Sequence, residues 1–339
     1  MKDIVIAVYG DLECGSSPVM PFVGKRFDGA YFTRAAKLYL SAALLRCGFD
    51  VFDPEPTARD TLDLPLRINR KNADAAVAIS FTSFGSRKSF NNVRGFSVHC
   101  PVGRFYSQSR ILGEDICAKL SDYRSEGQVL SDGTSTVNCP AVIVDVGYLT
   151  CFDEAKLVYD TDFAVGIAEH IALGICEHFG VAYIPRDDIS SYPLLCSGRR
   201  GKKVKMLQCL LNACGAAIAV DGTFGAATTS EVNKLCADNG KPLSGTATAD
   251  VWRDLLLVEI PELSYKSKNR AVRYIQSKLM SKLYPVEIDG EFGDKTLAAL
   301  NEFLSESVGG GAALGKTDKV TADIMRLLSP VGGGRPRLI

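Results

Sequence analysis

The chain has 339 residues, of which 46% are hydrophobic, and its 39 basic residues balance its 39 acidic residues. With no net charge, nucleic-acid binding through a basic face has little support, so nucleic acid is not an expected partner. Eleven cysteines, an odd number, are scattered without a Cys-x-x-Cys pair. This usage favours free thiols in a reducing compartment over a disulfide scaffold. The length allows two or three domains.

The beginning of the chain bears on where the protein resides. Residues 4–8 form an apolar strand-like run almost at once, without the longer apolar segment of a signal peptide. No stretch approaches the roughly 18 apolar residues that cross a bilayer, so the membrane is not an expected partner either. We therefore expect a cytoplasmic protein, and its release by cell lysis stays open.

Strand-like and helix-like patterns alternate over the first 183 residues. The apolar or extended runs are 4–8, 49–52, 74–81, 95–99 and 141–146. The helical patterns are 31–47, 107–120 and 163–179, with a short helix before residue 74. This alternation predicts an α/β fold with a mostly parallel sheet covered by helices. Ligand sites in such sheets lie beyond the carboxyl ends of the strands.

The C-terminal part contains an internal repeat. Three anchors share one offset, because 276−208, 289−221 and 296−228 all equal 68. These anchors are Gln208 and Gln276, Asp221 and Asp289, and Thr228 and Thr296. We therefore expect two copies of one small module.

Each copy has a pattern that predicts three helices. Asp221 can bond its own backbone two residues on and Gly222 can supply a positive φ, so the chain turns tightly there. Phe224 then folds inward between two helices. Thr228 and Glu231 have the spacing of a capping box, which predicts that the next helix opens at Thr228. A last helix closes each copy, at residues 248–256 and 321–328.

This order of Leu-Gln, Asp-Gly-x-Phe-Gly and Thr resembles the peptidoglycan-binding module of bacterial and phage cell-wall proteins. The resemblance implies that both copies bind wall glycan or its stem peptide. The module residues that it singles out are Asp221, Gly222, Phe224, Trp252, Asp289, Gly290 and Phe292. The same motif can also be purely structural, with a tight turn followed by an aromatic residue of the core, and then it needs no ligand.

The first domain resembles a second family. Four segments carry this resemblance, in order along the chain: residues 64–74 before a strand that ends at Ser80, the strand at residue 95, the helix from residue 107, and residues 140–149. Together they resemble the zinc-dependent N-acetylmuramoyl-L-alanine amidases. The resemblance implies a zinc ion held by two His and one Glu, with a further Glu as catalytic base.

The residues at the family's functional positions are different here. Tyr9, Gly29 and Ser80 stand at the three ligand positions, and Asp145 replaces the catalytic Glu. A neutral phenol, a missing side chain and a hydroxyl cannot hold zinc. We therefore expect a degenerate metal site, with no metal and no other cofactor. Asp145 has two interpretations. It can be a general base with a shorter side chain than Glu, or a structural residue that accepts backbone hydrogen bonds at the end of a strand. We prefer the structural interpretation.

The acidic residues and the cysteine near the start of the chain offer other ligand sets. Asp28 can occupy the Glu ligand position with a shorter reach, and an improvised site can be drawn from Asp28, Asp145, Asp11, Glu13 and Cys14.

Histidine is scarce in this chain. His170 and His178 lie eight residues apart on one predicted helix, about 12 Å along its axis, which is too far to share an ion. His99 is expected on a different strand, and each histidine is expected at the surface or the edge of the core. No Ser-His-Asp arrangement presents itself as a replacement catalytic group.

These patterns predict five segments. They are an amidase-like domain over 1–183, a linker over 184–203, modules over 204–257 and 269–329, and a flexible tail over 330–339. The leading hypothesis is a peptidoglycan-binding protein with a catalytically degenerate amidase-like domain. Its expected partners are peptidoglycan or its fragments, and a protein partner stays open. The alternatives are an active amidase or endolysin, and a structural component of a phage-like or injection assembly.

Overall fold

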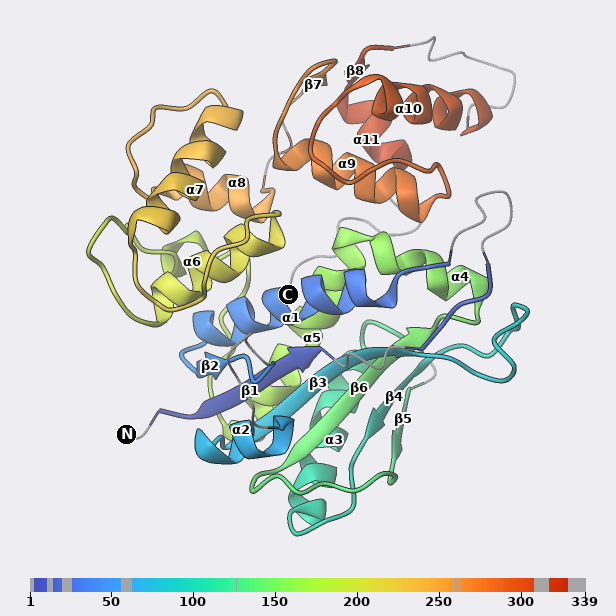
Figure 1. The fold of residues 1–339 in the computed structure, drawn as a ribbon, viewed down its shortest axis with the longest axis vertical. Coiled ribbons are helices and arrows are strands. Elements are labelled where there is room, and N and C mark those ends of the chain that lie inside the picture. Colours follow the sequence, from blue (N-terminus) through green and yellow to red (C-terminus); the bar gives the residue numbers. More distant parts are fainter. Residues whose placement is uncertain are drawn as a thin grey trace. The chain divides into compact units, whose positions relative to one another are not determined.

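A computed structural model describes residues 3–10, 15–19, 26–55, 63–125, 127–258, 260, 262–307 and 317–328 (Figure 1). The chain divides into two compact units. Unit 1 comprises Met1–Val158, Asp162–Ile184 and Lys205–Cys209, and unit 2 comprises Tyr159–Thr161, Pro185–Val204 and Leu210–Ile339. The predicted segment boundaries stay predictions. The tail over 330–339 lies outside the described residues.

Unit 1 is built on a six-stranded sheet with the order β2-β1-β3-β6-β4-β5. Its strands are β1 (Val5–Gly10), β2 (Asp50–Phe52), β3 (Ala75–Thr82), β4 (Phe96–His99), β5 (Gly127–Leu130) and β6 (Ala141–Tyr148). The pairs β1–β2, β1–β3, β3–β6 and β4–β5 are parallel, whereas β4 runs antiparallel to β6. The predicted mostly parallel sheet is confirmed. The antiparallel pair and the short strand β5 were not predicted.

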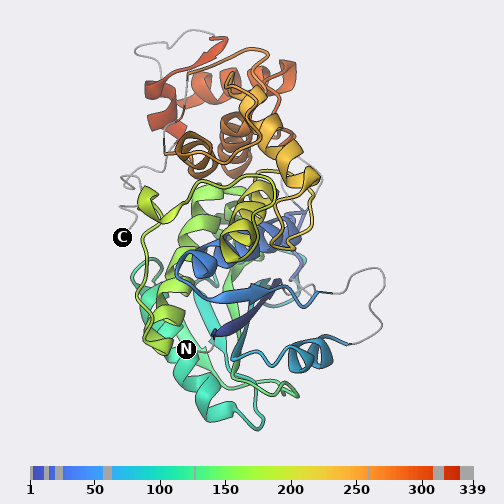
Figure 2. The same cartoon turned by 90° about the vertical axis from the view of Figure 1, so that its left-hand side faces the viewer.

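Helices cover both faces of this sheet. They are α1 (Gly29–Arg46), α2 (Leu64–Arg70), α3 (Tyr106–Ser121), α4 (Phe152–Ala155) and α5 (Thr161–Phe179), with a 3-10 turn at Lys156–Tyr159. On one face, the Phe81 ring of β3 lies 4.9 Å from the Phe32 ring of α1 and 6.2 Å from the Phe163 ring of α5. On the opposite face, Ile68 of α2 packs with Ala76 of β3. Figure 2 shows α2 on the other side of the strands from α3 and α5.

One buried carboxylate fixes the ends of β4 and β6. Glu154 of α4 accepts hydrogen bonds from the backbone N–H of Gly95, at 2.9 Å, and of Tyr148, at 2.8 Å. Its side chain also pairs with Arg124, and both side chains are nearly buried. Because the carboxylate joins the start of β4 to the end of β6, it holds the antiparallel pair in register.

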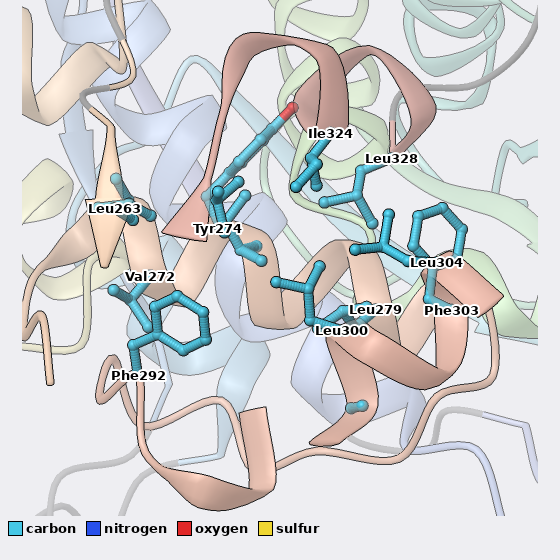
Figure 3. Close-up of a cluster of buried hydrophobic side chains, with 14 residues drawn as sticks. Leu263, Val272, Tyr274, Leu279, Phe292, Leu300, Phe303, Leu304, Ile324 and Leu328 are labelled. Atoms are coloured by element: carbon cyan, nitrogen blue, oxygen red, sulfur yellow. The ribbon is translucent and has the colours of Figure 1, made fainter. Parts of the chain in front are cut away.

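The repeated helices belong to unit 2, apart from residues Lys205–Cys209 of the first of them, which are grouped with unit 1. The first copy has α6 (Lys202–Ala213), α7 (Ala226–Asp238) and α8 (Ala249–Leu256), and the second has α9 (Arg270–Ser281), α10 (Asp294–Ser307) and α11 (Ala322–Leu328). The two predicted three-helix modules are therefore confirmed as folds. The second copy adds a ribbon of β7 (Leu263–Ser264) and β8 (Lys319–Val320). Figure 3 shows the side chains of α9, α10 and α11 meeting in one apolar cluster.

The capping box expected at Thr228 is wrong. Helix α7 begins two residues earlier, at Ala226, with Gly225 at its N-cap. Thr228 lies inside the first turn, where its hydroxyl donates to the Thr223 carbonyl at 3.5 Å. The closing helix α8 does have a side-chain cap, because the Thr248 hydroxyl accepts from the Val251 N–H at 3.4 Å.

No helix in the described part of the chain is both long and apolar enough to traverse a bilayer.

Candidate functional site

A row of polar side chains crosses the sheet of unit 1. Ser80 of β3 and Ser97 of β4 are both register partners of Asp145 on β6, so the three residues lie side by side. They are 2%, 2% and 9% exposed, respectively. Because side chains alternate along a strand, this row lies on the same face as Ala76, which α2 covers farther along β3. The structure therefore brings together two residues of the predicted site, Ser80 and Asp145.

His99 joins this row and connects it to a second carboxylate. Its Nε2 atom lies 3.2 Å from Oδ2 of Asp145 and 2.8 Å from the hydroxyl oxygen of Ser97. Its Nδ1 atom lies 2.8 Å from the carboxylate of Asp132, which follows β5. The His99 side chain is 19% exposed and the Asp132 side chain is 55% exposed. The imidazole thus bridges two carboxylates, one on each side of the ring.

The two carboxylates keep His99 charged. The hydrogen bond to Asp145 is the largest cause that raises the pKa of His99 from 6.5 to about 9, and the bond to Asp132 adds to it, while burial acts in the opposite direction. At neutral pH His99 is therefore an imidazolium, and both of its ring nitrogens donate. The cluster of Asp132, His99 and Asp145 carries one positive and two negative charges.

The connectivity Ser97–His99–Asp132 is that of a nucleophile, a base and an orienting acid. The expectation from the sequence, that no Ser-His-Asp arrangement exists, is wrong, because the three side chains lie within hydrogen-bond distance in that order. Two observations oppose a catalytic role at neutral pH. A protonated imidazole cannot accept the proton of the serine hydroxyl, and Ser97 is 2% exposed. The arrangement stabilises charge on the sheet instead.

Zinc does not fit the described residues of this site. The ligands of one zinc ion must converge on one point, whereas the two carboxylate partners of His99 lie on opposite nitrogens of its ring. Over the described ranges, no group of three or more His, Cys, Asp or Glu residues is placed to hold a metal ion. Asp11, Glu13 and Cys14, which the improvised site needs, lie outside those ranges.

The remaining residues of the predicted site have local roles. Tyr9 is the register partner of Ala78 and packs against the apolar cluster beneath α2. Asp28 is the N-cap of α1: its carboxylate accepts from the Tyr31 N–H at 3.2 Å and lies 3.6 Å from Arg34. Gly29 is the first residue of α1 and is buried.

The other two histidines, His170 and His178, lie on α5 and form local contacts away from the Asp145 row. His170 Nδ1 lies 2.8 Å from the Gly166 carbonyl oxygen, and its ring stacks on Tyr123 at 4.8 Å. His178 Nδ1 lies 2.8 Å from the Asp115 carboxylate. Both contacts tie α5 to neighbouring side chains or to its own backbone.

In the second module, the repeated Gln, Asp and Thr anchors form one hydrogen-bond network around the buried Gln276 side chain. Gln276 Nε2 donates to Asp289 at 2.7 Å and to the Thr296 hydroxyl at 3.0 Å. Gln276 Oε1 accepts from the Gly290 N–H at 2.8 Å, and Gln276 is fully buried. Asp289 also accepts from the Glu291 N–H at 2.8 Å. The motif therefore holds its own turn together.

The turns follow the expected chemistry in both modules. Gly222 has φ 73° and Gly290 has φ 85°, the left-handed region that glycine tolerates. Asp221 accepts from the Thr223 N–H at 2.8 Å, two residues on. These contacts confirm the Asp-Gly turn.

The aromatic residues of the motif are core residues. Phe224 and Phe292 are each 1% exposed, and Trp252 is fully buried with its indole N–H donating to the Pro193 carbonyl at 2.9 Å. The Tyr192 ring lies 5.1 Å from the Trp252 ring, and Phe292 belongs to the apolar cluster of the second module. A ligand-binding role for the seven motif residues stays a prediction.

The chain matches no family model and no curated protein. Solved structures with similarity to it include the N-acetylmuramoyl-L-alanine amidase AmiC2 of Nostoc punctiforme, with 19% identity and a TM-score of 0.42 over 53% of this chain and 99% of that one. The catalytic domain of the amidase CwlV from Bacillus (Paenibacillus) polymyxa var. colistinus has 21% identity and a TM-score of 0.42 over 53% of this chain and 100% of that one. An N-acetylmuramoyl-L-alanine amidase from Clostridium difficile 630 has 16% identity and a TM-score of 0.45 over 53% and 98%. Because these scores are below 0.5, the fold is taken from the sheet and helices of the chain itself.

Proposed function

We propose that the chain is a peptidoglycan-binding protein whose first unit does not act as a zinc amidase. The repeated module motif supports the wall as a ligand through its resemblance to peptidoglycan-binding modules. One observation carries the second half of the proposal: the Asp145 carboxylate lies 3.2 Å from the charged His99. A carboxylate that already accepts from a neighbouring imidazole is held in place by that contact, which supports a structural role over that of a general base.

The first unit then keeps a polar face without hydrolytic chemistry. The Ser97 hydroxyl and the Asp145 carboxylate are hydrogen-bonded to His99, and Ser80 donates to the Phe81 carbonyl at 3.3 Å. Each polar group is satisfied within the protein, so the face needs no ion to be stable. A muropeptide or a protein partner is the ligand class that we propose for it.

The test is a sedimentation assay of the full chain with purified peptidoglycan, with metal analysis of the same sample. We expect retention on the wall, zinc well below one equivalent after purification without chelator, and no release of stem peptide when zinc is added. Asp145→Asn is the matched variant, because it removes the carboxylate charge and keeps the side chain's size. Stem-peptide release by the wild type that falls in Asp145→Asn would overturn the non-catalytic half.

A second candidate function is favoured by the buried motif. Because Gln276, Phe224 and Phe292 are used inside the modules, these folds are stable building blocks without a ligand. A structural component of a phage-like or injection assembly is therefore the second candidate. Self-association of the full chain in analytical ultracentrifugation, with no retention on peptidoglycan, would select this candidate over wall binding.

A further inference from the structure

The β3–β4 loop, residues 83–95, brings positive charge to one edge of the sheet of unit 1. It follows the carboxyl end of β3, beside the carboxyl end of β6, because these two strands are parallel neighbours (Figure 1). Ligands of open α/β sheets bind beyond the carboxyl ends of the strands. The loop contains three basic residues and no acidic residue. Its charge therefore lies at the edge where such a sheet accepts a ligand.

The central part of this loop is anchored at both ends to Thr150, which follows β6. The Phe84 N–H donates to the Thr150 hydroxyl at 3.0 Å, and the Asn91 N–H donates to the Thr150 carbonyl at 2.8 Å. The Asn91 side chain also donates to the Phe84 carbonyl at 3.2 Å, which closes the loop on itself. Thr150 is fully buried. A loop that is anchored before a ligand arrives costs less ordering entropy on binding.

The loop presents an apolar ring and two cations to solvent. Phe84 is 56% exposed, although a phenylalanine ring gains most from burial. Arg87 and Lys88 are exposed as well, and neither side chain forms a hydrogen bond or an ion pair with the described residues. Arg87 has a φ of 58°, a region that glycine adopts more easily. Neither packing nor backbone geometry therefore explains an arginine at this position.

The third cation of the loop is already engaged. Lys156 and, to a lesser extent, Arg94 lower the pKa of Asp153 on α4. Arg94 therefore has an acidic neighbour, whereas the charges of Arg87 and Lys88 are available to a ligand. An exposed aromatic ring close in sequence to two such cations is complementary to a ligand that combines carboxylates with apolar groups.

We propose that Phe84, Arg87 and Lys88 recognise the free carboxylates of a peptidoglycan stem peptide. The proposal rests on the wall binding proposed above and names the part of unit 1 that contacts the ligand. A guanidinium binds a carboxylate through two parallel hydrogen bonds, and the ammonium adds a second charge-assisted bond. The Phe84 ring packs against the apolar part of the ligand. Because both ion pairs are exposed, each contributes modestly and the two act together.

The experiment measures the affinity of the full chain for a disaccharide tetrapeptide, released from purified peptidoglycan by a muramidase, by isothermal titration calorimetry. The same fragment with its carboxylates methyl-esterified is the uncharged probe. We expect Arg87→Gln combined with Lys88→Gln to weaken binding of the native fragment about fivefold to tenfold. Esterification should weaken binding to the wild type by a similar factor. Phe84→Ser should weaken binding of both fragments.

A second readout locates the ligand. A carbodiimide, which joins a carboxylate to a nearby amine, should couple the native fragment to Lys88, and mass spectrometry maps the product. Arg104→Gln is the matched control, because Arg104 is also exposed but follows β4. Since β4 runs antiparallel to β6, its end lies at the opposite edge of the sheet. This variant should leave the affinity and the coupling unchanged.

The outcomes separate the role of the loop from wall binding by the full chain. Retention on intact peptidoglycan, with equal affinity of the wild type and the double variant for the fragment, would keep wall binding and overturn the role of the loop. Loop-dependent binding of the fragment without retention on the wall would do the reverse. Coupling mainly to another lysine, or equal binding of the esterified fragment, would also overturn the proposal. So would loop-dependent binding to phosphatidylglycerol vesicles without binding of the fragment, which would assign the loop to a lipid surface.

Discussion

The charge on His99 should make the stability of the protein depend on pH in a defined window. The groups that face its ring are the carboxylate of Asp145 on β6, the carboxylate of Asp132 after β5 and the hydroxyl of Ser97 on β4. A rise of the His99 pKa from 6.5 to about 9 is equivalent to about 3 kcal/mol of free energy of unfolding. Because the folded state binds the proton more tightly, this contribution is fully present below about pH 6.5. It is lost as the pH rises through about 9.

The perturbation that isolates this contribution is His99→Gln, which keeps a hydrogen-bonding side chain and removes the charge. We expect the wild type to exceed the variant in free energy of unfolding by about 3 kcal/mol more at pH 6 than at pH 10. Urea unfolding followed by circular dichroism at pH 6, 7, 8, 9 and 10 measures the difference directly. His178→Gln is the control, because His178 pairs with a single carboxylate, that of Asp115.

The reasoning would be refuted by a difference between wild type and His99→Gln that stays constant within about 0.5 kcal/mol across that range. Such a result would mean that His99 is neutral in the folded protein.

Three further substitutions test the packing and the networks. Phe292→Ala should cost about 3–5 kcal/mol in urea unfolding, because its ring is 1% exposed in the core of the second module; a cost below 1 kcal/mol would contradict that placement. Gln276→Ala should cost about 1–3 kcal/mol and speed proteolysis at the turn, because it leaves the Gly290 N–H without its acceptor; unchanged cleavage would argue against the network. Glu154→Ala should cost about 3–5 kcal/mol in thermal unfolding, because it strands the nearly buried Arg124; a melting temperature equal to the wild type would exclude this role.

The fold could be predicted where the sequence pattern is strong. Long apolar runs marked β3 and β6 within one residue of their starts, and the Asp-Gly-x-Phe-Gly motif marked the turn and core aromatic of both modules. Strand β5 was missed because its residues Gly127–Leu130 are exposed or only half-buried and form no apolar run. The start of α7 was misplaced because Gly225 caps the helix before Thr228 can.

The candidate site could be predicted only in part. Ser80 and Asp145 were expected in one site through the resemblance to the amidases, and they are register partners on β3 and β6. His99 was missed, because its contact with Asp145 depends on the antiparallel pairing of β4 with β6, which no local pattern reveals. One signal was available: Ser97 and His99 are two residues apart on a strand and must share a face.

The Gln276 network has a consequence for how such modules evolve. A signature whose Gln, Asp-Gly and Thr residues bond to one another can be inherited through selection for folding alone. Descendants are then free to exchange what they recognise, by changing the outward-facing residues, while still bearing the ancestral fingerprint. Shared ancestry of shape and shared choice of ligand then become separate questions, because a module can keep its fold after its ligand has changed.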